Sequence, residues 1–273
     1  MKYHDFLVKE IGNSIENVSK IPKGYQLIGH VALLNIDSDL MSLAEVIGDL
    51  TLIFESRAES VAVRTGPTYG QKRNPNYRLV AGSRNTTTTH IENGIRFKLD
   101  PLRITFSRGN VNERILLPDQ VSSKEYVVDM FACVGQFSLP IAVHSGAEVL
   151  AIEINDLAYD FLCQNMMMNE VHANMKAVLG DCRDVPFGNA NRIVMGYLHD
   201  TIDFLPHALR GLQSPGGIIH MHGLVHGTAE DKIRNTIITE SSEFGFMAEI
   251  SSRLIKKYSP GVYHRVFDIK LFS

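Results

Sequence analysis

Cysteine is scarce in this chain, and its placement excludes two common uses of the residue. Three cysteines occur among 273 residues, at positions 133, 163 and 182, and no Cys-x-x-Cys pair is present. Scattered thiols in odd number provide neither a disulfide framework nor the paired ligands of a structural zinc site. We therefore expect an intracellular, reducing location, namely the cytoplasm.

Long apolar runs are also missing. No segment approaches the roughly 18 consecutive apolar residues of a membrane span, and the first ten residues, Met1–Glu10, lack the apolar region of a signal peptide. The sequence therefore predicts no membrane partner and no secretion. A length of 273 residues suits one large or two modest domains.

An overall excess of positive charge is absent, because the net charge is −3. The charges are nevertheless unevenly distributed: Arg57 to Arg114 holds eleven Lys and Arg against four acids, a local charge of +7, which leaves −10 elsewhere. This asymmetry predicts a basic, RNA-facing module joined to an acidic domain. A solvated charged surface is the alternative.

The most informative segment lies near the middle of the chain. An apolar strand at Tyr126–Asp129 runs into a loop of small residues ending at Gly135, and a second apolar strand ends in Glu153, 18 residues later. A strand, helix and strand in this order place a ligand at the strand end and its ribose hydroxyls on the acid. The segment therefore predicts a site for a nucleoside-type cofactor.

The loop favours S-adenosylmethionine over a dinucleotide. It lacks the G-x-G-x-x-G glycines that allow close approach to a pyrophosphate, and Asp129 adds a negative charge that suits a sulfonium and an ammonium group. A third strand, Met175–Leu179, precedes Asp181, whose carboxylate could accept from an adenine amino group. Acids placed at strand ends only for solubility are the alternative.

The C-terminal part alternates strands and helices, which predicts an α/β fold. The expected class is a Rossmann-like methyltransferase domain with a seven-stranded, mostly parallel sheet over residues 119–273. Asn155 is expected to cap the helix that begins at Asp156. The expected later strands are Arg192–Leu198, Ile218–His222, Met247–Ile255 and Tyr263–Leu271.

The N-terminal part, residues 1–118, reads as a smaller α+β domain with an antiparallel sheet. A helix is expected near Leu43–Gly48. The expected strands are Leu27–Leu34, Thr51–Phe54, Ser60–Val63, Tyr77–Ala81, His90–Ile91 and Ile95–Leu99.

Several motifs together resemble one family. They are Gly29–Leu34, Arg64–Gly66, Gly70–Arg73, His90–Phe97, Phe106–Ser107, Glu113–Arg114, Asp129–Ala132, Ala151–Ile154, Gly180–Asp181 and Tyr258–His264. The chain is similar in these motifs to the tRNA guanosine-37 N1-methyltransferases of archaea and eukaryotes and to their sister enzymes of wybutosine synthesis. The methyltransferases typically carry an extra N-terminal domain for the tRNA elbow. About 25 residues precede the similar region here, so we expect that domain to be absent.

The end of the fourth strand distinguishes the two sisters. The methyltransferases have an Asn-Leu-Pro or Asn-Pro-Pro type motif there, whose Asn holds the base, whereas this chain has Gly196-Tyr-Leu-His199. That sequence resembles the archaeal wybutosine-synthesising aminocarboxypropyltransferase. The resemblance implies transfer of the 3-amino-3-carboxypropyl group of S-adenosylmethionine to carbon 7 of 4-demethylwyosine at position 37 of tRNA(Phe), with release of methylthioadenosine. Guanosine-37 N1-methylation is the alternative, and a tRNA-binding protein that holds S-adenosylmethionine without turnover is a second.

The resemblance also implies roles for individual residues. Glu153 is expected to bind the ribose and Asp181, with Cys182, the adenine. The other expected cofactor residues are Ser107, Arg114, Asp129, Phe131 and Gly135. Tyr197 and His199 are expected beside the acceptor base, with Glu113 as a candidate general base. Cys133 stands where the methyltransferases usually have Gly, and we expect it to crowd the usual pocket of the methionyl tail.

The partner implied by the resemblance is the anticodon loop of tRNA(Phe), bound by a monomer. Four arginines are expected to contact its backbone: Arg64, Arg73, Arg78 and Arg84. A metal site is not expected. His220, His222 and His226 lie close in sequence, but no carboxylate or cysteine completes a ligand set.

Overall fold

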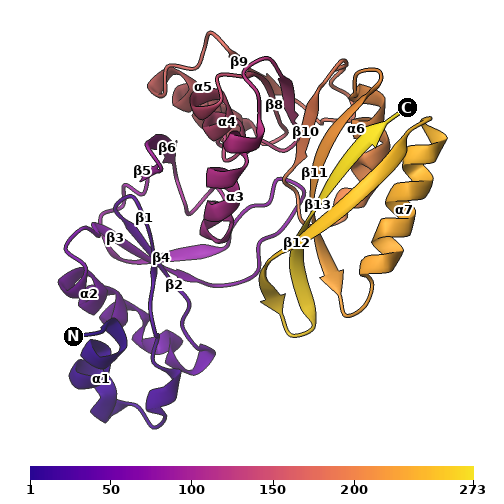
Figure 1. Cartoon of the computed structure of the whole chain (residues 1–273). Coiled ribbons are helices and arrows are strands. Elements are labelled where there is room, and N and C mark those ends of the chain that lie inside the picture. The colour runs from indigo at the N-terminus through magenta and orange to yellow at the C-terminus, as the bar shows by residue number, and fades with distance from the viewer. The chain divides into compact units, whose positions relative to one another are not determined.

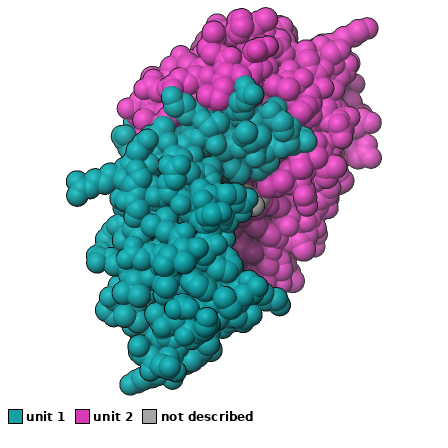
Figure 2. Space-filling view, turned by 90° about the vertical axis from the view of Figure 1, so that its left-hand side faces the viewer, with its two compact units in different colours: residues 1–106 teal, residues 107–273 magenta. Residues whose placement is uncertain are grey.

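The computed structural model describes residues 1–107 and 109–273 with their side chains. They form two compact units, residues 1–106 and residues 107–273, which Figure 1 shows as a cartoon and Figure 2 in separate colours. No helix in this described part is long and apolar enough to cross a bilayer.

The boundary lies between Phe106 and Ser107, earlier than the predicted boundary after residue 118. The intervening residues belong to the second unit because helix α3 (Val111–Leu116) carries Glu113, whose carboxylate pairs with Arg253 at 2.6 Å.

The first unit holds a four-stranded sheet and a separate hairpin. The sheet order is β1-β2-β3-β4, and β5 pairs only with β6. The elements are α1 (Tyr3–Ile11), β1 (Gln26–Ile28), β2 (Val31–Leu34), α2 (Ala44–Phe54), β3 (Ser60–Arg64), β4 (Tyr77–Gly82), β5 (Thr88–Glu92) and β6 (Ile95–Leu99), with short 3-10 turns η1 (Gly12–Ser14), η2 (Val18–Lys20) and η3 (Ser38–Leu43). Aliphatic side chains of α1, α2 and the sheet form its core.

Three predictions for this unit are wrong in detail. The expected strand Leu27–Leu34 is a hairpin of two strands, because Gly29 turns the chain with a φ of +52° and leaves no room for a side chain beside Thr88. The expected strand at Thr51–Phe54 is the end of helix α2, where Thr51 Oγ1 donates to the Ile47 carbonyl at 2.6 Å. The sheet is mixed rather than antiparallel, since α2 is a crossover that makes β2 and β3 parallel.

The second unit confirms the predicted seven-stranded sheet. Its order is β12-β13-β11-β10-β7-β8-β9, and β13 is antiparallel to both neighbours, while the remaining strands pair in parallel. The strands are β7 (Tyr126–Asp129), β8 (Glu148–Glu153), β9 (Met175–Leu179), β10 (Arg192–Met195), β11 (Gly216–His226), β12 (Met247–Ser259) and β13 (Val262–Phe272).

The helices of this unit connect and cover the strands. They are α3, α4 (Ser138–His144), α5 (Asp156–Met168), α6 (Leu205–Gly211) and α7 (Glu230–Glu243), with 3-10 turns η4 (Arg108–Asn110), η5 (Pro118–Gln120) and η6 (Thr201–Phe204). Asn155 caps α5 as predicted: its Oδ1 accepts from the backbone N–H groups of Leu157 and Ala158. Apolar residues of β7, β8, β10, β11 and β13 with α6 and α7 form the main core.

Two strand lengths differ from the prediction and shape the functional edge. Strand β10 ends at Met195 instead of Leu198, and the chain then turns through Asp200, which has a left-handed φ of +54°. Strand β11 continues to His226 and stays paired with β13 along its whole length. The extended ends of β11 and β13 therefore stand beyond the end of β10 (Figure 1).

Candidate cofactor and acceptor site

The loop after β7 lies where the order of the strands reverses. β7 is flanked by β10 and β8, which connect onward in opposite directions, and ligands of open α/β sheets bind at such a point. The Met130 N–H donates to the Val194 carbonyl at 3.0 Å and the Ala132 N–H to the Ile152 carbonyl at 2.9 Å. Both neighbouring strands therefore hold the loop in place.

Asp129 supports this loop from inside the protein. Its side chain is fully buried, and Oδ1 accepts from the Phe131 N–H at 3.2 Å. Burial raises the pKa of Asp129 to about 7, because an ionised carboxylate loses its hydration there. The negative charge that the sequence predicts next to the cofactor is thus only partly present at neutral pH.

Glu153 ties the loop to the end of β8. Its Oε2 accepts from the Cys133 N–H at 2.6 Å and its Oε1 from the Asn155 N–H at 2.7 Å. Cys133 has a φ of +53°, a conformation that glycine adopts freely and other residues adopt under strain. Burial raises the pKa of the Cys133 thiol to about 12, so this side chain is a neutral group inside the loop.

The end of β9 presents an ion pair. Asp181 accepts two hydrogen bonds from the Arg183 side chain, at 2.9 Å and 2.5 Å, and this contact lowers the pKa of Asp181. The Arg183 guanidinium lies 5.1 Å from the centre of the Phe204 ring. Cys182 is buried, which raises the pKa of its thiol to about 12.

Aromatic rings line the end of β10. Phe131 and Tyr197 stack with centroids 5.2 Å apart, and Phe204 meets Phe131 edge-on at 5.0 Å. These rings form an aromatic cluster between the end of β7 and the end of β10, and an aromatic ring offers a face on which a planar base can stack. The His199 ring lies 6.1 Å from that of Tyr258 in β12.

Ser107 and Arg114 contact the cofactor loop through the side chain of Gln136. No motif in the sequence marks Gln136 as a site residue. The Gln136 Oε1 accepts from the Ser107 N–H at 3.1 Å and from Arg114 Nη1 at 3.4 Å. Arg114 is almost fully buried and also donates to the Ser107 carbonyl at 2.7 Å. Arg114 therefore holds the backbone of Ser107 beside the cofactor loop.

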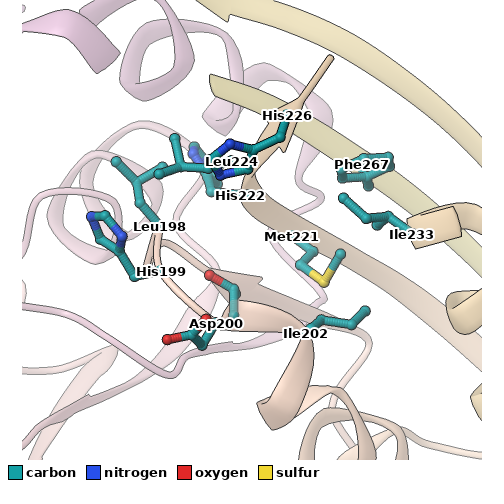
Figure 3. A pocket seen from close by; sticks show the side chains of 12 residues that line it. Leu198, His199, Asp200, Ile202, Met221, His222, Leu224, His226, Ile233 and Phe267 are labelled. Atoms are coloured by element: carbon teal, nitrogen blue, oxygen red, sulfur yellow. The ribbon is translucent and has the colours of Figure 1, made fainter. Parts of the chain in front are cut away.

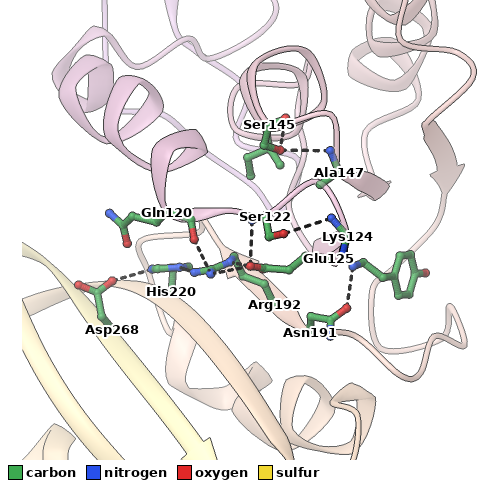
Figure 4. Close-up of polar contacts among 12 residues, drawn as sticks. Gln120, Ser122, Lys124, Glu125, Ser145, Ala147, Asn191, Arg192, His220 and Asp268 are labelled. Carbon is green, nitrogen blue, oxygen red and sulfur yellow. Dashed lines mark hydrogen bonds and ion pairs between the residues drawn. The ribbon is translucent and has the colours of Figure 1, made fainter.

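A chain of hydrogen bonds and ion pairs joins residues on neighbouring strands of the second unit, and Figure 4 shows its part from Glu125 to Asp268. Arg192 donates to Glu125 at 2.7 Å and lies with Nη1 2.6 Å from His220 Nε2. A guanidinium only donates, so His220 Nε2 accepts, and its Nδ1–H donates to Asp268 at 2.6 Å. Asp268 in turn accepts from Arg253 at 2.8 Å.

The pKa values along this chain follow from burial and neighbours. Burial lowers the pKa of His220, and the Arg192 charge lowers it further. Burial opposes ionisation of Asp268, but the hydrogen bonds from His220 and Arg253 hold its pKa well below the usual range. Glu113, which the sequence predicts as a candidate general base, lies at the far end of this chain, where its carboxylate pairs with Arg253.

The three histidines that lie close in sequence have separate surroundings. His220 contacts Arg192 and Asp268, His222 contacts His264, and His226 is exposed at the end of β11. Within residues 1–107 and 109–273, no three His, Cys, Asp or Glu side chains gather closely enough to hold a metal ion.

The four arginines predicted to contact RNA all lie in the first unit, and three of them are exposed: Arg64, Arg78 and Arg84. Arg64 and Arg78 are on the adjacent strands β3 and β4. Arg64 borders a surface pocket of about 440 Å³ lined by residues 35, 36, 38, 41 and 64–67. Arg73 is half-buried, with a left-handed φ of +54°. All four lie far from the cofactor loop in sequence.

The sheet order, the loop at its switch point and the acids after β8 and β9 define the class of Rossmann-like, S-adenosylmethionine-dependent transferases. A family model described as the TRM5/TYW2 methyltransferase domain matches residues 88–246, and one described as the TYW2 N-terminal domain matches residues 5–86. The chain belongs to the TRM5/TYW2 family.

Individual relatives match the chain over most of its length. The tRNA(Phe) (4-demethylwyosine(37)-C(7)) aminocarboxypropyltransferase of Pyrococcus horikoshii is 37% identical, covering 100% of this chain and 97% of its own. The tRNA (guanine(37)-N(1))-methyltransferase Trm5b of Pyrococcus abyssi is 30% identical, covering 96% of this chain and 79% of its own. The crystal structure of P. horikoshii TYW2 in complex with MeSAdo superposes with a TM-score of 0.86 at 35% identity, covering 98% of this chain and 99% of that one.

Proposed function

We propose that this chain transfers the 3-amino-3-carboxypropyl group of S-adenosylmethionine to C7 of 4-demethylwyosine at position 37 of tRNA(Phe). The observation that carries the proposal is at the end of β10. A Cβ on Gly196 would lie 2.9 Å from Cε2 of Phe137, so this position offers no side-chain amide to hold a guanosine amine. The P. horikoshii relative, which matches the whole chain, is named for this same transfer.

The reaction needs positioning more than it needs a strong base. C7 supplies the electron pair of the new carbon–carbon bond, the bond between sulfur and the aminocarboxypropyl carbon breaks, and the sulfur keeps that pair in methylthioadenosine. C7 then loses its proton. Proton acceptance by Glu113 would break its ion pair with Arg253, so we assign the proton to water and a positioning role to Glu113.

Glu153 and Asp181 are suited to the adenosine end. The two oxygens of the Glu153 carboxylate each accept from a backbone N–H group. We propose that this carboxylate, which ends β8 beside the loop, also accepts from the ribose hydroxyls. Asp181, kept ionised by Arg183, can accept from the adenine amine, with the Cys182 backbone beside it.

The remaining loop residues shape the path of the methionyl tail. Phe131 and Gly135 line the loop, Asp129 supports it from below, and Ser107 and Arg114 close it through Gln136. Cys133 adds a half-buried side chain to the turn. We propose that it turns the tail so that the aminocarboxypropyl carbon, and not the methyl, lies about 3–3.5 Å from the acceptor carbon.

Tyr197 and His199 lie where the acceptor base must enter. Tyr197 is stacked on Phe131 and can extend that stack to a base taken out of the anticodon loop. Arg64, Arg73, Arg78 and Arg84 would contact the RNA backbone, which offsets the free energy of extruding the base. The first unit thus serves as the RNA-facing domain of a protein that acts as a monomer in the cytoplasm.

The decisive experiment uses S-adenosylmethionine labelled either in the methyl group or in the methionyl carboxyl carbon. The acceptor is tRNA(Phe) carrying 4-demethylwyosine. Carboxyl label in the RNA, together with released methylthioadenosine, supports the proposal. Methyl label in the RNA with released adenosylhomocysteine would establish the methyltransferase instead, and RNA binding without either label would indicate a binding protein.

A further inference from the structure

Two buried histidines meet on the long strands beside the site. His222 in β11 and His264 in β13 lie with His222 Nδ1 3.0 Å from His264 Nε2. The side chains are almost completely buried, at 1% and 0% exposure. One ring must therefore donate its proton to the other.

Both rings are neutral at physiological pH. Burial, together with the nearby charge of Lys256, lowers the pKa of His264 to about 4. Burial also lowers the pKa of His222 far below its ordinary value, with smaller contributions from His264, His220 and Arg253. Each ring then carries one proton, on one of its two nitrogens.

The surroundings of His264 decide which nitrogen that is. His264 Nδ1 is buried and has no hydrogen-bond partner among the residues that the structure describes. A buried N–H without an acceptor is rarer and less favourable than a buried lone pair without a donor. His264 therefore carries its proton on Nε2 and donates to His222 Nδ1, which leaves the proton of His222 on Nε2.

The Nε2–H of His222 forms no hydrogen bond with any described residue, and the ring lines a cavity of about 210 Å³ (Figure 3). The cavity lies between the segment that follows β10 and the extended end of β11. Half of its lining residues are apolar, namely Leu198, Ile202, Met221, Leu224, Ile233 and Phe267, and Asp200, Thr201 and His226 also border it. His199, expected beside the acceptor base, also lines it.

We propose that this cavity receives an edge of the acceptor base and that His222 Nε2–H donates a hydrogen bond to a ring carbonyl oxygen there. His264 is the positioning residue, because its Nε2–H fixes the proton of His222 on the nitrogen that faces the ligand. A flat base with a carbonyl acceptor suits a cavity that combines apolar walls with the buried His222 donor. The proposal rests on the proposed function, since it takes the acceptor to be a guanosine-derived tricyclic base.

Nitrogen NMR of the protein labelled with ¹⁵N-histidine tests the tautomer without any substrate. The signals of His222 are identified as those absent from His222→Gln. Protonation at Nε2 is expected for His222, and protonation at Nδ1 would overturn the proposal.

Kinetics with tRNA carrying 4-demethylwyosine test recognition. His222→Phe, which has no donor, is expected to raise KM for the tRNA about tenfold while leaving the affinity for S-adenosylmethionine unchanged. His222→Gln keeps an N–H at a similar reach and is expected to recover most of the loss. If His222→Phe does not fold, His222→Met replaces it. His172→Phe, at an exposed histidine before β9, is the matched control.

An unchanged KM in the donor-free variant would refute the role of His222. Transfer of the methyl group by the wild-type enzyme would refute the proposed function instead. In that case the tautomer of His222 and the KM comparison would still test whether His222 donates to the acceptor base.

Discussion

The ring of Phe137 lies against Gly196, so that a Cβ at position 196 would be 2.9 Å from Cε2 and 3.1 Å from Cδ2 of the ring. Phe137 is buried directly after the cofactor loop, and Gly196 directly follows β10. The packing of the cofactor loop and the side chain permitted at the acceptor position are therefore linked.

Gly196→Asn is expected to destabilise the fold by about 1–3 kcal/mol, because the new side chain must displace a buried ring. The same variant is expected not to gain methyl transfer, since displacing Phe137 disturbs the cofactor loop. Chemical denaturation and the two-label assay measure these outcomes. Gly223→Ala is the stability control, because its Cβ would meet Phe267 at an ordinary 3.9 Å. A stable Gly196→Asn protein that methylates the RNA would contradict the prediction.

Asp129 gives a pH-dependence of stability with a definite sign. Its pKa is about 7 in the folded protein and near its ordinary value of 3.8 in the unfolded chain. Between these pH values the folded state holds more protons, so the contribution of Asp129 to stability falls as the pH rises and levels off above about pH 7.

Asp129→Asn removes this titration. The difference in the free energy of unfolding between wild type and Asp129→Asn is therefore expected to shift against the wild type from pH 4 to pH 7. Urea unfolding at several pH values measures it. A difference that stays constant across this range would show that Asp129 is ionised in the fold.

Arg64 is expected to contribute one phosphate contact to tRNA binding. Arg64→Ala should weaken binding and lower the slope of log K against log salt concentration by about 1. Binding measured between low and moderate salt gives that slope. Arg57→Ala is the charge-matched control, because Arg57 is paired with Glu55 at 2.7 Å. An unchanged slope for Arg64→Ala would remove this residue from the RNA surface.

The strands and helices of the second unit could be predicted from the sequence because each is encoded by residues that lie next to one another in the chain. The apolar strands, the small-residue loop and the Asn155 cap are read within a few residues of one another, and the structure places them as expected. The segment Thr51–Phe54 was mispredicted because its β-branched and aromatic residues favour a strand locally, whereas tertiary packing on Tyr3 makes it a helix.

The contacts within the site could not be predicted in the same way. His222 and His264 meet only because β11 and β13 pair in one register. The hydrogen bond between Cys133 and Glu153 depends on the exact path of the loop. Such contacts join residues far apart in the chain, so periodicity and spacing carry no information about them.

The chain of charges from Glu125 through Arg192, His220, Asp268 and Arg253 to Glu113 has a consequence for how this family can diverge. Its charged groups alternate in sign, with the neutral ring of His220 between Arg192 and Asp268, and a buried charge that loses its partner is strongly unfavourable. Single replacements at these positions should be purged, whereas paired replacements that restore the alternation should survive. Across related sequences, positions that contact each other in this chain are thus expected to change in pairs or not at all.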